Sequence, residues 1–165
     1  MDQSLESRLN ALLQAGWEVQ RASAPQSLPA FFLARFDWLP ISVQDFLTHV
    51  DSAVSSDQKA WFITRKEIAG ESDSAFAWDE WEFLSLETAE DDPDWQNAII
   101  AFWDEHCPLV LSVKNGYSHL SMRRDNLAIV AGNEPEFEEV EVVAESWEQL
   151  LEKVATNDPS LSLYI

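Results

Sequence analysis

Residues 92–144 decide the fold, and they read DPDWQNAIIAFWDEHCPLVLSVKNGYSHLSMRRDNLAIVAGNEPEFEEVEVVA. The beginning of this stretch predicts a helix over residues 92–106. Asp92 suits the N-cap, Pro93 suits the first helical position, and apolar residues recur at helical spacing after them. Its buried face is expected to consist of four apolar residues: Ile99, Ile100, Phe102 and Trp103.

The rest of the stretch predicts an antiparallel meander. Four segments have the apolar or alternating composition of strands: 109–113, 117–123, 127–131 and 137–144. Asn115-Gly116 lies between the first two strands, and this pair favours the positive backbone dihedral angles of a tight hairpin turn. The first of the four is apolar enough to be a central strand of the sheet.

Helices are predicted at both ends of the chain. Residues 4–15 carry leucines on one helical face. Residues 146–154 begin with Ser146 and Gln149 at the spacing of a capping box. The sequence therefore predicts one α+β domain over residues 1–165, in which N- and C-terminal helices wrap a mainly antiparallel sheet.

The first half of the chain carries weaker signals. We expect four elements there: a strand over 17–21, a helix over 40–50 capped by Ser42, a strand over 61–64 and a polar loop over 67–74. Residues 78–84 alternate between apolar and acidic residues. This alternation fits a strand or a helical turn, and both interpretations stay open.

The composition is that of a globular protein. The chain has 165 residues, 46% hydrophobic content and eight tryptophans, which suit one domain with a substantial core. Cys107 is the single cysteine, so the fold does not depend on an internal disulfide or an oxidising compartment. The N-terminus lacks the apolar core of a secretory signal, and the apolar stretches are too short to span a bilayer. We therefore expect a cytoplasmic protein.

Charge is the most pronounced feature of the composition. Thirty acidic and ten basic residues give a net charge of −20. Residues 1–70 hold eight acids and six bases, whereas residues 71–165 hold twenty-two acids and four bases. Such a field disfavours nucleic acid and anionic membranes as partners and favours a basic protein. The alternative is that the acids only keep the protein soluble.

No pattern of catalytic or metal-binding residues stands out. The histidines and the cysteine lack the paired spacing of a zinc site: His49, His106, His119 and Cys107. We expect His119 to be exposed or half-buried in its strand, and Cys107 to be buried at a helix end. The four glycines indicate turns or caps, and no phosphate-binding or nucleotide-binding motif occurs. The sequence therefore predicts a protein that is not an enzyme and that holds no metal or cofactor.

Two acidic clusters supply the candidate partner-binding residues. The first cluster contains no basic residue and mixes acids with aromatics. Its candidate contacts are Trp78, Asp79, Glu80, Trp81, Glu82, Glu87, Glu90, Asp91, Asp92 and Asp94. Phe83 and Trp95 are interleaved with these residues or adjoin them. The second contains eight glutamates, of which the candidate contacts are Glu134, Glu136, Glu138 and Glu139, and the others are Glu141, Glu145, Glu148 and Glu152. Such mixtures suit an interface with a basic protein, because aromatics supply anchors and carboxylates pair with Arg and Lys. The alternative, which we favour for Trp103 and Trp147, is that the aromatics belong to the core.

The order and spacing of several segments resemble the SUKH superfamily, which includes bacterial toxin-immunity proteins and fungal regulators of cell-wall synthesis. The segments are WLPISVQDFLTHV at 38–50, WFI at 61–63, WDEWEFLSL at 78–86, AIIAFWDEHCPLVLSVKNGYSHLSM at 98–122 and GNEPEFEEVEVVAESWEQLLEKV at 132–154. The region that these segments span, residues 38–154, makes up about two thirds of the chain. Many members carry Gly-Gly or Asn-Gly soon after the Leu-Pro helix, where this chain has Asp51-Ser52-Ala53.

The resemblance implies a single SUKH-like α+β domain without catalytic residues. It also implies that a bacterial member neutralises a partner toxin, often a nuclease, and this agrees with the charge because a nuclease site is basic. Our leading hypothesis is therefore an immunity-type inhibitor of a basic toxin domain. Two alternatives stay open. One is a regulatory scaffold in cell-wall or stress signalling, and the other is an enzyme or small-ligand binder with a pocket under the helices.

Overall fold

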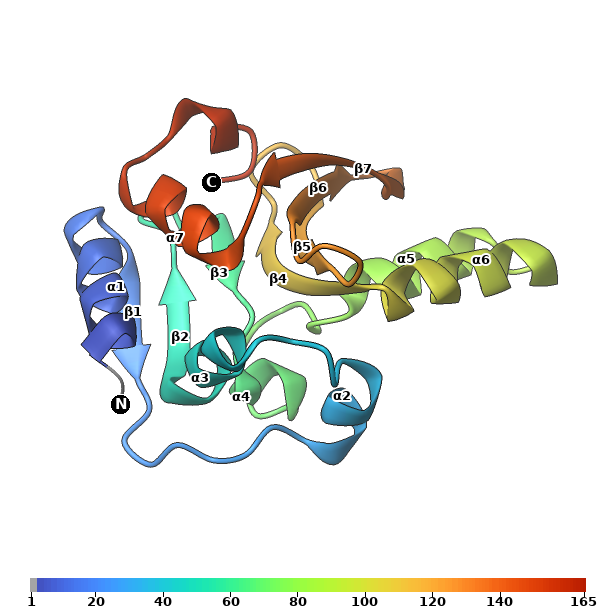
Figure 1. Cartoon of the computed structure of the whole chain (residues 1–165). Coiled ribbons are helices and arrows are strands. Elements are labelled where there is room, and N and C mark those ends of the chain that lie inside the picture. The colour runs from blue at the N-terminus through green and yellow to red at the C-terminus, as the bar shows by residue number, and fades with distance from the viewer. Residues whose placement is uncertain (1–2) are drawn as a thin grey trace.

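The structure is a computed structural model that describes residues 3–165, and within them it contains one seven-stranded sheet. The strands follow one another in chain order, and every neighbouring pair is antiparallel. They are β1 (Glu18–Arg21), β2 (Val50–Val54), β3 (Ala60–Phe62), β4 (His106–Ser112), β5 (Ser118–Arg123), β6 (Ile129–Asn133) and β7 (Glu136–Ala144). The predicted α+β fold is confirmed, and the meander runs through the whole sheet (Figure 1).

The helices form two groups around this sheet (Figure 1). They are α1 (Gln3–Gln14), α2 (Ala30–Arg35), α3 (Ile41–His49), α4 (Arg65–Ile68), α5 (Glu80–Thr88), α6 (Pro93–Asp104), α7 (Trp147–Ala155) and the short 3-10 helix η1 (Pro159–Leu161). In the first group, Phe46 of α3 and Trp147 of α7 pack on Phe62 of β3, with ring centroids 5.1 and 6.0 Å away. The second group is α5 and α6, which extend from the other end of the sheet as a hairpin.

The strand register shows that the two groups lie on opposite faces of the sheet. Trp61, Leu111 and His119 are cross-strand neighbours, so they share the face opposite to that of Phe62. His119 contacts Trp103 of α6, with ring centroids 4.7 Å apart. It follows that α6 covers the His119 face, whereas α3 and α7 cover the Phe62 face.

Two predicted helix starts are confirmed by their hydrogen bonds. The Asp92 side chain accepts a hydrogen bond from the Trp95 N–H at 3.1 Å. The Ser146 hydroxyl accepts one from the Gln149 N–H at 3.1 Å, and the Gln149 side chain accepts one from the Glu145 N–H at 2.7 Å. In a capping box the Gln149 side chain would accept from the N–H of the cap residue, Ser146. Here it accepts from Glu145, the residue before the cap.

The helix predicted over residues 40–50 exists, but its predicted cap was wrong. Pro40 occupies the N-cap position of α3, where no side chain makes a capping hydrogen bond, and Ser42 lies inside the first turn. The helix ends at His49 and β2 begins at Val50. The sequence analysis missed β2 because its polar residues have low strand propensity. Its antiparallel pairing with β1 and β3 compensates for this.

Short helices were also missed, because four to six residues are too few to show helical periodicity. The predicted loop over 67–74 begins inside α4, and residues 78–84 belong largely to α5, so the helical interpretation is correct. The helix predicted over residues 92–106 ends at Asp104. Cys107 is buried as predicted, but it lies in β4 and not at a helix end.

His119 and Gly132 correct two further expectations. His119 is only 1% exposed, and Gly132 lies opposite to it within β6, not in a turn or cap. The His119 Nε2–H donates to the Phe137 carbonyl at 2.8 Å, so Nδ1 accepts a hydrogen bond from the Ser121 hydroxyl at 2.7 Å. Burial lowers the pKa of His119 to about 4, so the ring is neutral.

Residue 132 must be a glycine, because the His119 ring and the β7 backbone leave no room for a side chain. A Cβ at residue 132 would lie 2.3 Å from the Phe137 carbonyl oxygen and 2.6 Å from His119 Nε2. Both distances are shorter than van der Waals contact, so any side chain here displaces the imidazole or the β7 backbone.

We predict that Gly132→Ala lowers the free energy of unfolding by about 3 kcal/mol, because it overpacks the core and breaks the His119 hydrogen bond. The control is Gly70→Ala, where φ is +73° and no atom lies within 4 Å of the new methyl group. That variant should lose only about 1 kcal/mol from backbone strain. Urea denaturation measures both, and equal losses would contradict the steric account.

Candidate functional site: an acidic ridge on α5 and α6

Acidic side chains follow α5, its connection to α6, and the start of α6, which together form the hairpin that extends from the sheet (Figure 1). We name the following six residues the acidic ridge: Glu80, Glu87, Glu90, Asp91, Asp92 and Asp94. Glu80 is half-buried and the other five are exposed. Within residues 3–165, no member of the ridge forms an ion pair. The ridge therefore presents negative charge that no basic side chain within this part of the chain neutralises.

Two aromatic side chains are exposed beside the ridge. Phe83 of α5 is 53% exposed, and Trp95 of α6 is 47% exposed. Phe83 also lines a shallow groove of about 780 Å³, together with Glu80, Leu86, Glu87, Glu90 and Gln96. Ile100 was expected to be buried, but it is 41% exposed, because α6 buries only the stripe that carries Ile99 and Trp103. Apolar surface and acidic charge thus occur together on this hairpin.

Trp78 and Trp81 were candidate partner contacts, but both are buried. The Trp81 side chain donates a hydrogen bond from Nε1 to the Ser118 carbonyl at 2.7 Å, and it stacks on Tyr117 and Phe137 with centroids 4.5 and 5.6 Å away. Trp78 packs edge-on against Phe32 of α2 and against Phe36, the residue that follows α2. These two tryptophans fix α5 to the body of the protein, and Phe83 and Trp95 take the role of exposed aromatics.

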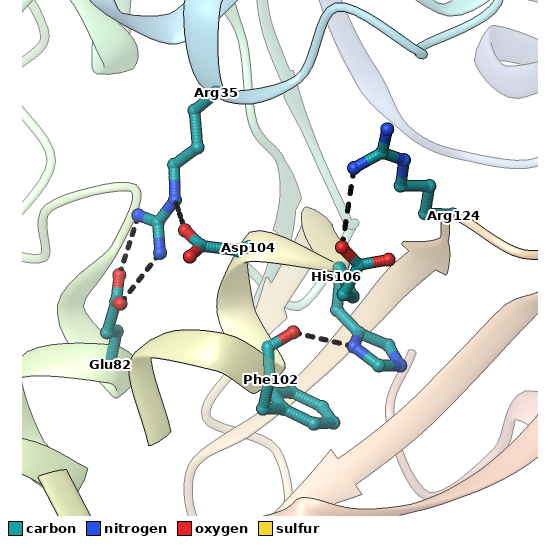
Figure 2. A network of polar contacts seen from close by, with 7 residues as sticks. Arg35, Glu82, Phe102, Asp104, His106 and Arg124 are labelled. Atoms are coloured by element: carbon teal, nitrogen blue, oxygen red, sulfur yellow. Dashed lines mark hydrogen bonds and ion pairs between the residues drawn. The ribbon is translucent and has the colours of Figure 1, made fainter. Parts of the chain in front are cut away.

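Glu82 is likewise an internal residue, with its side chain 10% exposed. Its carboxylate accepts two hydrogen bonds from the Arg35 guanidinium, at 2.8 and 2.9 Å, and Arg35 Nε donates a third to Asp104 at 2.9 Å (Figure 2). Arg35 therefore joins α2 to both helices of the hairpin. Arg35 could not be predicted from the sequence, because it lies 47 positions from Glu82 and no local pattern links them.

A second ion pair near this network is of a different kind. Arg124 contacts Glu105 at 3.3 Å, and both side chains are about half exposed. Beside it, the His106 Nδ1–H donates to the Phe102 carbonyl at 2.7 Å, and the two rings stack with centroids 3.9 Å apart (Figure 2). The exposed pair is screened by solvent, so removing one of its partners should cost less than leaving the buried Glu82 carboxylate without Arg35.

The second acidic cluster adjoins the first through α5 and β7. The Ser85 hydroxyl of α5 donates a hydrogen bond to the Glu138 carboxylate of β7 at 2.9 Å. Burial raises the pKa of Glu138, and the Ser85 hydrogen bond opposes that shift. The remaining members of the cluster are exposed: Glu134, Glu136 and Glu139. The hydrogen bond and like charge of Glu136 raise the pKa of Glu139. The structure therefore brings the two acidic segments next to each other.

Asp79 is half-buried at the start of α5. Burial raises the pKa of its carboxyl group, and its side chain makes no capping hydrogen bond. Its partial burial makes it a weaker candidate contact than the exposed acids of the ridge.

The thiol and two of the imidazoles that the sequence analysis considered are buried or hydrogen-bonded within the protein. Cys107 is completely buried, and burial raises the pKa of its thiol. His119 has both ring nitrogens hydrogen-bonded inside the core, and His49 Nδ1 hydrogen-bonds to the Asp45 carbonyl at 2.8 Å. Among residues 3–165, no three His, Cys, Asp or Glu side chains gather as a metal site would require. The helices of this same part of the chain include none with the length and apolar character needed to cross a membrane.

A comparison of the chain with protein-family models, with curated proteins and with solved structures finds no significant match. Membership of the SUKH superfamily therefore stays a prediction from the sequence.

We predict that Arg35→Met lowers the free energy of unfolding by about 3 kcal/mol, because it leaves the buried Glu82 carboxylate without its counter-ion. Arg124→Met removes the exposed pair and should cost less than about 1 kcal/mol. Adding Glu82→Leu to Arg35→Met should recover part of the loss. Chemical denaturation of the three variants tests this prediction, and equal effects of the two arginine substitutions would contradict it.

Proposed function

We propose that this protein works by binding a basic protein domain at the acidic ridge, as an immunity-type inhibitor of a basic toxin of the nuclease class. The observation that carries the proposal is the combination of six acids without ion pairs and two exposed aromatic side chains on one helical hairpin. Binding, not catalysis, is the proposed activity, and the cytoplasm is the proposed location.

The placement of Glu87, Glu90 and Asp91 supports a role in binding, whereas the other three ridge acids lie at helix N-termini, where the helix dipole favours an acid. Glu87 lies in the last turn of α5, which contains no basic residue. A negative charge at the C-terminal end of a helix opposes the helix dipole and costs about 0.3–1 kcal/mol. The neighbouring Glu90 and Asp91 add repulsion between like charges. A basic partner would relieve both penalties, whereas acids that served only solubility could occupy positions without this cost.

In the proposed complex, the acidic charge controls the association rate and the exposed aromatic side chains control the dissociation rate. The acid excess of residues 71–165 would steer a basic domain towards the hairpin and speed its association, with a strong dependence on salt. Phe83 and Trp95 would then be buried and slow dissociation, as central aromatics do in protein interfaces. A nuclease domain is basic where it holds phosphate, so an acidic ridge is complementary to it.

The resemblance to the SUKH superfamily supports the inhibitor in particular, because its bacterial members include immunity proteins. The regulatory scaffold in cell-wall or stress signalling is the alternative from the same resemblance. It predicts partners that are not toxins and binding that is insensitive to salt.

The test begins with capture of the partner by the tagged protein at low salt, followed by measurement of association rates with the purified partner domain. We predict that the triple reversal Glu87→Lys, Asp91→Lys and Asp94→Lys slows association by at least ~10-fold at low salt, and that the difference shrinks at high salt. The same purified domain would enter a toxicity-rescue assay.

A matched control separates the ridge from overall charge. Glu145→Lys, Glu148→Lys and Glu152→Lys change the net charge by the same amount at exposed positions next to and on α7. Similar rates for the two triple variants would contradict the assignment of the ridge. An unchanged rate in both would also overturn electrostatic steering.

A further inference from the structure

A cleft of about 490 Å³ lies apart from the ridge, on the sheet face that α3 and α7 do not cover. Trp61 of β3 forms part of its floor, since it points to the face opposite to Phe62. The walls come from β1, β2, α4 and the segment 71–76. This volume is in the usual range for small-ligand sites.

The cleft has an aromatic wall. Trp61 and Phe76 stack with ring planes within 15° of parallel and centroids 5.9 Å apart. Val54 and Val113 add further apolar surface. A planar group with an apolar face would pack well against this wall.

Two of the lining residues hold a buried polar atom without a partner. These atoms are Trp61 Nε1, a hydrogen-bond donor, and Glu67 Oε2. The neighbouring cations are already engaged, because Lys66 pairs with Asp51 at 3.0 Å and Arg65 pairs with Glu71. Burial raises the pKa of Glu67 to about 8. Unsatisfied buried polar groups are costly, so their occurrence together in one cleft points to a ligand that satisfies them.

The segment 72–76 is the wall that can yield to a ligand. Of the described residues, none outside the segment forms a backbone–backbone hydrogen bond with it. Two hydrogen bonds to side chains lie within the segment: the Ser74 N–H donates to the Ser72 hydroxyl, and the Phe76 N–H donates to the Ser74 hydroxyl. Phe76 holds the C-terminal end of the segment through its ring contacts with Trp81 and Tyr117. Displacement of residues 72–75 would break no backbone hydrogen bond to the rest of the described chain.

We propose that this cleft binds a guanidinium group carried next to an amide carbonyl, with Glu67 as the counter-ion, Trp61 as the stacking surface and the Trp61 N–H as donor to the carbonyl. A guanidinium is planar, stacks on indole rings and forms forked hydrogen bonds with carboxylates, which an ammonium does not. Acidic residues outnumber Lys66 around the cleft, so an anion is disfavoured. This inference is independent of the function proposed for the ridge.

The probe is N-acetyl-arginine amide, and N-acetyl-citrulline amide is its neutral isostere. Calorimetric titration at pH 8.5 should show saturable binding of the first, and binding of the second that is at least ~10-fold weaker. The affinity for the arginine probe should fall by about tenfold per pH unit from pH 8 to pH 6, because the carboxyl group must lose its proton to act as counter-ion. Glu67→Gln should abolish binding, whereas Glu87→Gln, on the ridge, should leave it unchanged.

The folding of Glu67→Gln is checked by its melting temperature. The pKa of Glu67 is raised from 4.5 to about 8 in the folded protein, so wild-type stability falls as pH rises between these values. The glutamine variant lacks this loss and should melt above the wild type at pH 9 and at the same temperature at pH 4. A folded variant that still binds the probe, or equal binding of the two probes, would overturn the proposal.

The source of the guanidinium is decided by a second arm of the experiment. If an arginine of the captured partner domain enters the cleft, Glu67→Gln will weaken binding of that domain as well as of the probe. If the ligand is a free small molecule, the variant will lose the probe alone. Failure of the probe to bind in any form of the protein overturns the cleft proposal and leaves the ridge untouched.

Discussion

The burial of Trp81 determines where the acidic ridge lies. Its indole ring is held between Tyr117 and Phe137 and its N–H is bonded to the Ser118 carbonyl, so α5 is fixed to the sheet along one side. The Arg35 guanidinium then joins the hairpin to α2 through Glu82 and Asp104. These interactions bury one side of α5, and the hairpin keeps its acids, Phe83 and Trp95 exposed to solvent.

The basic residues explain why the ridge keeps its charge. Across the described residues, the ion pairs formed by arginine and lysine are all with acids outside the ridge: Arg21–Glu6, Arg35–Glu82, Arg35–Asp104, Arg65–Glu71, Lys66–Asp51, Arg123–Asp125 and Arg124–Glu105. The scarce cations thus stabilise the fold elsewhere. Apart from Asp92, which caps α6, the acids that stabilise the fold through ion pairs differ from those of the ridge, so Glu87, Asp91 and Asp94 can be altered without breaking an ion pair.

Sequence patterns of a few residues predicted most of the strands, turns and helix caps, because these depend on interactions between near neighbours in the chain. The meander follows from alternation and turn residues, and the caps at Asp92 and Ser146 follow from their own sequence neighbours. Long-range contacts decided the rest. The spacing of Trp78 and Trp81 fits an exposed anchor as well as a core face, and only the sheet and α2 show that both are buried. The cleft at Trp61 draws its walls from strands, a helix and a loop far apart in the chain, so no sequence pattern marks it.

The central claim is that a basic domain covers the exposed side of the hairpin. Hydroxyl-radical footprinting of the protein with and without its captured partner domain tests it directly, because exposed side chains are oxidised in proportion to their accessibility. We expect oxidation of Phe83 and Trp95 to fall sharply in the complex and that of Leu13 on α1, which is also exposed, to stay the same. Protection of Leu13 with unchanged oxidation of Phe83 and Trp95 would place the interface elsewhere and contradict the account.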